Sequence, residues 1–176
     1  MEKPIMQLTK DKRKIDEKLF WSLIEEARSV SSDQMDFIDQ LRVLLESFRV
    51  SELRNFQKIF YIKINELNTW EHWALAYIVR SGCGDDEFDY FKAWAVSKGK
   101  ESFEAIKDLA EDKLVSIFDE DPQLEQFYYL TSEIYELKTG EFMPPVRVKS
   151  SKLTGKKWDE DKLTEAFPSL CKLFNY

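Results

Sequence analysis

The sequence predicts an all-α fold, a single compact helical domain of about seven or eight helices. Glycine and proline are scarce, with five of each in 176 residues, which argues against many short strands joined by turns. Apolar residues recur at steps of three and four along most of the chain, as they do on one face of a helix. Aromatic residues form 14% of the sequence and can fill a substantial core.

The first half of the chain contains four predicted helices. Their ranges are 17–30, 34–47, 51–67 and 70–81. Asp16, Asp33 and the pair Asn68-Thr69 stand directly before helical patterns, where N-cap residues stand. The third range is rich in β-branched residues, so a strand over 59–64 is the alternative there.

The second half continues with further helical patterns. The predicted ranges are 86–98, 100–110, 112–118 and 122–138. A glycine of the Gly82-Cys83-Gly84 turn is expected to end the fourth helix in the left-handed conformation. Asp85 or Asp86 is then expected to cap the fifth helix.

The two ends of the chain lack this helical periodicity. Residues 1–14 are expected to form a mobile basic lead-in before a domain over 15–176. Residues 141–158 contain Pro144-Pro145 and several lysines, and they predict an irregular loop or arm. The closing stretch, 167–170, is expected to dock aromatic side chains on the body of the domain.

Five stretches of the sequence form a recognisable pattern. They are A-Y-I-V-R-S-G-C-G-D-D-E-F-D-Y-F-K-A-W, the following S-K-G-K-E-S-F-E-A, L-F-W-S-L-I-E-E-A-R near the start, and Y-E-L-K-T-G and W-D-E-D-K-L-T-E-A-F-P-S-L near the end. Together they resemble the bacterial domain of unknown function 4240 (DUF4240), over about residues 16–174. Ser81 departs from this pattern, because a small Gly-like residue is expected there. The resemblance implies a small, soluble, all-helical bacterial protein and supplies no activity, cofactor or catalytic residue.

Charge and cysteine content weigh against several classes of function. The formal net charge of −7 disfavours binding to nucleic acid and to anionic membranes, and no run of about 18 apolar residues predicts a membrane span. Cys83 and Cys171 lie far apart, which favours a reduced cytoplasmic protein with two free thiols over a disulfide. One histidine and two distant cysteines provide no zinc site of the usual spacing, and no cofactor motif is present.

Acidic residues concentrate in one stretch of the chain. Residues 82–141 carry 16 acidic and six basic side chains, a net charge of −10. Four acids fall within five residues, namely Asp85, Asp86, Glu87 and Asp89, which is more than helix capping requires. Capping with a solvated face is one interpretation, and a recognition surface for a basic protein is another. A calcium site is disfavoured, because the spacing lacks the alternation and glycine of an EF-hand.

Aromatic and polar residues complete the candidate surface. The predicted partner-binding residues are Asp85, Asp86, Glu87, Asp89, Tyr90, Trp70, His72 and Glu133. Trp70 and Tyr90 are candidate interface anchors, although two helices packed through their aromatic stripes explain them as well. His72 is more simply a structural or surface residue, because Cys83 would lie about 16 Å away along an unbroken helix.

These features predict a noncatalytic protein-binding protein that needs no cofactor and no metal. We expect an immunity-type protein whose acidic-aromatic surface covers the active groove of a basic toxin domain. The alternative is an enzyme or small-ligand binder with a pocket at Gly82–Asp89, where Asp85, Asp86 and His72 converge. Outward-facing carboxylates favour binding, whereas carboxylates that converge in a pocket with raised pKa values favour the alternative.

The basic residues of the arm predict a solvated loop. They lack a glycine-rich phosphate loop and interleaved aromatic residues, so a phosphate or nucleic-acid site is disfavoured. These residues are Arg147, Lys149, Lys152, Lys156 and Lys157.

Overall fold

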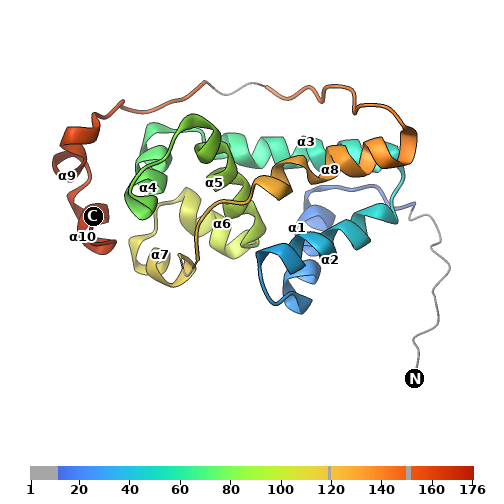
Figure 1. Cartoon of the computed structure of the whole chain (residues 1–176), viewed down its shortest axis with the longest axis horizontal. Coiled ribbons are helices and arrows are strands. Elements are labelled where there is room, and N and C mark those ends of the chain that lie inside the picture. The colour runs from blue at the N-terminus through green and yellow to red at the C-terminus, as the bar shows by residue number, and fades with distance from the viewer. Residues whose placement is uncertain (1–11, 119, 150–151) are drawn as a thin grey trace. The chain divides into compact units, whose positions relative to one another are not determined.

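Figure 1 shows a computed structural model of the chain, which describes residues 12–118, 120–149 and 152–176. The regular elements in these ranges are all helices, apart from isolated β-bridge residues such as the pair Thr69 and Thr154. The all-α fold class is therefore confirmed. Residues 1–11 of the predicted N-terminal lead-in lie outside the described residues.

Ten α-helices and one short 3-10 helix make up the regular structure of the described residues. Their bounds are α1 Glu17–Val30, α2 Gln34–Glu46, α3 Val50–Glu66, α4 Trp70–Arg80, α5 Asp85–Ser97, α6 Lys100–Lys107, α7 Glu111–Ile117, α8 Glu125–Thr139, η1 Glu160–Lys162, α9 Leu163–Ala166 and α10 Pro168–Leu173. The predicted number of helices is too low, because the closing stretch forms three elements of three, four and six residues. Elements this short contain too few apolar residues to show a helical period.

The N-caps of three helices form as predicted. The Asp16 and Asp33 carboxylates accept hydrogen bonds at 2.8–2.9 Å from backbone N–H groups in the first turns of α1 and α2. Thr69 Oγ1 accepts a hydrogen bond at 3.1 Å from the N–H of His72 in α4. Each bond satisfies a backbone donor that has no partner within its own helix.

Helix α3 includes residues 59–64, for which the sequence also allows a strand. Phe56, Phe60 and Ile64 are buried and recur every fourth residue, which places them on one face of a helix. A strand would alternate buried and exposed side chains. The strand alternative is therefore wrong. Burial of one helix face outweighs the preference of the β-branched residues for strands.

The turn between α4 and α5 differs from the prediction in two ways. Ser81, rather than a glycine, takes the left-handed conformation that ends α4, with φ 56° and ψ 42°. The N-cap of α5 is Gly84, and the Glu87 carboxylate accepts a hydrogen bond from the Gly84 N–H at 2.7 Å. Asp85 and Asp86 lie within the first turn of α5, so neither caps the helix.

The described residues group into two compact units, and the division falls within α3 and α8. The first unit comprises residues 12–59 and 129–147. Helices α1 and α2 pack against each other in this unit (Figure 1). The Phe20 and Phe56 ring centroids lie 4.7 Å apart in its core. A single domain over 15–176 stays a prediction.

The second unit comprises residues 60–128, 148–149 and 152–176. Its helix α10 packs against α4 and α7. Aromatic rings connect the C-terminal ends of α7 and α10 to α5, because Phe118 lies 4.9 Å from Trp94 and 5.4 Å from Phe174 between ring centroids. The aromatic residue that docks the end of the chain on the body of this unit is thus Phe174, which lies after the predicted docking stretch 167–170.

Candidate functional site

The eight predicted partner-binding residues divide between the two units. Glu133 belongs to the first unit, where its carboxylate pairs with Arg42 Nη2 at 2.7 Å. The other seven residues belong to the second unit. The candidate site is therefore built from the second unit alone.

Two of the four clustered acids are neutralised within the protein. Glu87 pairs with Arg80 Nη1 at 3.2 Å, and Asp89 pairs with Lys92 Nζ at 2.7 Å. The backbone hydrogen bond from Gly84 is the main cause that lowers the pKa of Glu87, followed by Arg80. These two carboxylates serve the local structure, since one binds the N-terminus of α5 and the other holds a buried lysine.

The other two acids face solvent at the start of α5. Asp85 and Asp86 are exposed, and within the described chain neither side chain forms an ion pair or hydrogen bond. Their charges lie at the positive end of the helix dipole, which stabilises them there. We call Asp85 and Asp86 the α5 acidic pair.

The two predicted aromatic anchors are half-buried and already packed. The Trp70 ring stacks on Trp73 with centroids 5.4 Å apart and an interplanar angle of 7°. The Tyr90 hydroxyl donates to Glu125 at 3.1 Å, and its ring meets Tyr128 edge-on at 6.2 Å. Helix packing therefore explains both aromatic residues.

His72 is a structural residue and not part of an exposed surface. Its side chain is buried, with Nδ1 2.7 Å from Thr69 Oγ1. Nε2 lies 3.2 and 3.1 Å from the carbonyl oxygens of Ile106 and Lys107. Burial is the main cause that lowers the pKa of this imidazole. His72 links the start of α4 to the end of α6 and is removed from the partner-binding set.

Both cysteines are buried and free in this structure. Burial raises the pKa of the Cys83 thiol to about 11, so its reactive thiolate form is scarce at neutral pH. The Cys83 carbonyl accepts a hydrogen bond from Trp73 Nε1 at 2.8 Å. Cys83 therefore fills a small buried position.

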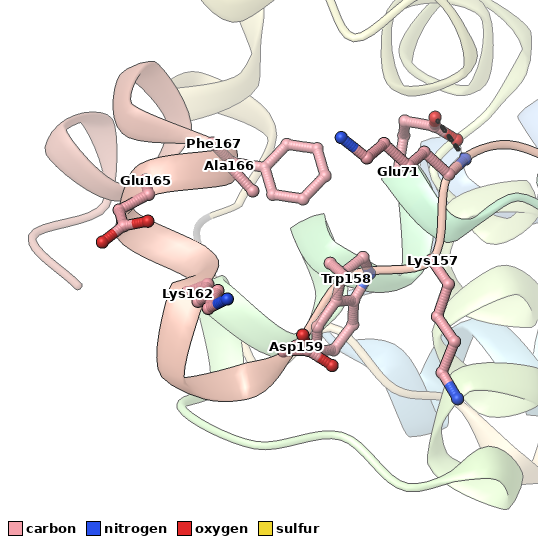
Figure 2. Close-up of a pocket in the computed structure, with 9 residues that line it drawn as sticks. Glu71, Lys157, Trp158, Asp159, Lys162, Glu165, Ala166 and Phe167 are labelled. Atoms are coloured by element: carbon pink, nitrogen blue, oxygen red, sulfur yellow. Dashed lines mark hydrogen bonds between the residues drawn. The ribbon is translucent and has the colours of Figure 1, made fainter.

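A cavity of about 530 Å³ lies beside the start of α4 in the same unit (Figure 2). Its lining residues are Glu71, Lys156, Lys157, Trp158, Asp159, Lys162, Glu165, Ala166 and Phe167. The sequence predicts that Lys156 and Lys157 belong to a solvated loop, and it predicts no role for Glu71. We call this cavity the C-terminal pocket.

Backbone hydrogen bonds fix one wall of the C-terminal pocket to α4. The Trp70 N–H donates to the Thr154 carbonyl at 2.8 Å, and the Thr154 N–H donates to Asn68 at 3.2 Å. Trp158 Nε1 donates to the Trp70 carbonyl at 2.7 Å. Thr154, in the predicted irregular arm, is thus not helical, but it is hydrogen-bonded to the backbone of Asn68 and Trp70.

Gly155 allows the Glu71 carboxylate to approach the arm. Gly155 has φ +88°, and a Cβ at this position would overlap both carboxylate oxygens of Glu71. The Lys156 N–H donates to Glu71 Oε1 at 3.4 Å. The T-G-K-K-W sequence is the one signal that could have revealed this site, since an isolated glycine often marks a close approach.

Comparison with known proteins assigns a family to the chain. A family model described as a protein of unknown function (DUF4240) matches residues 15–137. The chain belongs to the DUF4240 family. No curated protein and no solved structure gives a significant match to it.

The DUF4240 match covers the α5 acidic pair and most of the helices. It ends before the segment that supplies eight of the nine lining residues of the C-terminal pocket. The stretch W-D-E-D-K-L-T-E-A-F-P-S-L, which contributes to the resemblance in sequence, lies beyond the matched residues.

In the part of the chain that the structure describes, no helix is both long and apolar enough to cross a membrane. Over the same residues, no group of three or more His, Cys, Asp and Glu side chains is placed to hold a metal ion.

Proposed function

We propose that this chain is a noncatalytic protein-binding protein whose α5 acidic pair binds a basic partner. The supporting observation is that only two of the four clustered acids form ion pairs within the protein. Glu87 and Asp89 have internal cations, whereas Asp85 and Asp86 are exposed. Two carboxylates at a helix N-terminus that face solvent can form charge-assisted hydrogen bonds with Lys or Arg of a partner.

An immunity protein in a bacterial cytoplasm is the biological role that we assign to this binding. A basic toxin domain that acts on a phosphate-bearing substrate has a cationic groove, and carboxylates can occupy it in place of phosphate. The complementary charges would accelerate association. Two buried free thiols suit a reducing compartment.

The alternative function, a catalytic or ligand-binding pocket at Gly82–Asp89, receives less support. It needs His72 to converge with Asp85 and Asp86. His72 is buried near the start of α4, with both ring nitrogens used, and the acids lie beyond the other end of that helix. Eight residues of helix separate His72 from Arg80, about 12 Å at the normal rise.

The experiment that tests the proposed function compares two pairs of exposed acids. Asp85→Asn/Asp86→Asn removes the α5 acidic pair without introducing positive charge at the helix N-terminus. The matched control is Glu111→Gln/Asp112→Asn, which removes two exposed acids from the first turn of α7 in the same unit. Both variants lose similar helix-dipole stabilisation, about 0.3–1 kcal/mol per charge.

The tagged proteins are incubated with host lysate at low and high salt, and co-purified proteins are identified and quantified by mass spectrometry. We expect a stoichiometric basic protein that is lost at high salt. At low salt its recovery should fall with the α5 variant and not with the α7 control. Equal recovery with both variants, or no stoichiometric partner, would contradict the proposal.

A further inference from the structure

We propose that the C-terminal pocket binds a mononucleotide, a planar ring that carries hydroxyl groups and a phosphate. This inference is independent of the α5 acidic pair, because the two sites share no residue. It rests on three features of the pocket: an aromatic wall, ammonium groups with no internal carboxylate partner, and a carboxylate that can accept hydrogen bonds.

Trp158 and Phe167 provide the aromatic wall. Figure 2 shows their rings on two sides of the cavity. Trp158 is held by its indole hydrogen bond to α4, and it meets Trp70 and Tyr77 in T-shaped contacts at 6.1 and 5.4 Å. Trp158 also lines the cavity, and a planar base that enters the pocket would stack on the indole face turned toward it.

Lys156 and Lys162 provide the phosphate-binding groups. Both line the cavity, and in the described chain neither ammonium group is paired with a carboxylate. Lys157 has a different role, since its ammonium lies 5.6 Å above the Trp70 ring. In Figure 2 its side chain points away from Trp158 and Phe167. A phosphate between Lys156 and Lys162 would accept charge-assisted hydrogen bonds.

The three carboxylates of the pocket do not neutralise the charges of Lys156 and Lys162. Glu71 is engaged with the backbone of the arm, and Glu165 points away from the two aromatic rings in Figure 2. Asp159 lies next to Trp158 and can accept hydrogen bonds from ribose hydroxyls or a base amino group. The pocket thus offers complementary groups to each part of a nucleotide.

The size of the pocket and the charge of the protein favour a mononucleotide over a nucleic-acid chain. A volume of about 530 Å³ lies within the range of about 300–1,000 Å³ that small ligands occupy. The net charge of −7 opposes binding to a polyanion. Close approach of Glu71 to Gly155 keeps one wall in place before the ligand arrives, which reduces the entropy lost on binding.

Isothermal titration of the full chain with adenosine 5′-monophosphate tests this inference. Adenosine, which lacks the phosphate, and inorganic phosphate, which lacks the ring, are titrated in parallel. We expect the whole nucleotide to bind more tightly than either part. Lys156→Glu/Lys162→Glu should weaken nucleotide binding at least about tenfold, because each lost ammonium–phosphate bond contributes enough for such a change.

Lys172→Glu is the control for a charge reversal outside the pocket. Lys172 is exposed on α10 in the same unit and does not line the pocket, so we expect less than about a twofold change in affinity. Circular dichroism verifies that each variant is folded. The proposal is overturned if adenosine 5′-monophosphate does not bind, if it binds no better than adenosine, or if the pocket variant and the control bind equally.

Discussion

Ser81 carries a conformational cost that glycine would remove. A non-glycine residue in the left-handed region costs roughly 1 kcal/mol, and Ser81 is exposed with φ 56°. We expect Ser81→Gly to raise the free energy of unfolding by about 0.5–1 kcal/mol. Urea denaturation followed by circular dichroism measures this change.

The control for Ser81→Gly is the same substitution within a helix. Ser116 is exposed in α7, where glycine should lower stability by about 0.5 kcal/mol. Opposite signs at the two positions would show that backbone conformation decides the effect. A loss of stability with Ser81→Gly would mean that the serine side chain contributes more than the strain costs.

Glu87 should make stability depend on pH. Its carboxylate accepts the Gly84 N–H and pairs with Arg80, and these contacts lower its pKa from the ordinary 4.5. A group whose pKa is lower in the folded state adds stability above its unfolded pKa, and this stability is lost as pH falls through the folded pKa. Its contribution is therefore complete at neutral pH and disappears in acid.

Glu87→Gln tests this linkage. The variant should be less stable than wild type at neutral pH, and the difference should narrow from about pH 5 to about pH 3. Urea denaturation midpoints at a series of pH values provide the measurement. If the two proteins lost stability in parallel over this range, the carboxylate of Glu87 would not be the group responsible.

At the scale of elements, Gly155 joins the arm to α4. Gly155→Ala combines a positive φ with an overlap against Glu71, whereas Gly140→Ala at φ +74° meets no atom within 4 Å. We expect about 1 kcal/mol of destabilisation from conformation at Gly140 and a larger loss at Gly155. Thermal unfolding of both variants measures the difference.

A second substitution isolates the overlap at Gly155. Glu71→Ala removes the carboxylate, so the additional cost of Gly155→Ala should largely disappear in the double variant. A double-mutant cycle measures this coupling. Additive effects of the two substitutions would show that the close approach of Glu71 to Gly155 is not significant in solution.

The sequence predicted those elements whose determinants are local. Asp16, Asp33 and Thr69 are caps because one side chain binds a backbone donor two or three residues away. The start of α8 was misplaced because it depends on a distant partner. The Leu124 N–H donates to the Tyr90 carbonyl at 3.0 Å, and no local pattern records this bond.

The distinction between local determinants and distant partners also applies to the candidate site. The acidic cluster is visible in sequence, but which acids are free depends on where Arg80 and Lys92 point. The C-terminal pocket joins Glu71 to residues more than 80 positions later, so its lysines resemble a solvated loop until α4 is placed beside them. Periodicity contains no information on such pairings.

At the scale of the whole molecule, charge should control the rate at which the proposed partner binds. The net charge of −7, with −10 concentrated in residues 82–141, attracts a basic protein over distances near the Debye length. We expect the association rate constant to fall roughly tenfold or more as salt rises from about 50 mM to about 500 mM. The dissociation rate constant should change much less.

Stopped-flow mixing or surface plasmon resonance with the identified partner separates these two rates. Asp85→Asn/Asp86→Asn should lower association at low salt and flatten its salt dependence, because the α5 acidic pair would face the partner. Lys172→Glu should not slow association, since it adds negative charge outside the proposed contact. An unchanged salt dependence in the α5 variant would mean that steering comes from the diffuse charge of the molecule. In that case the α5 acidic pair would not be the docking point.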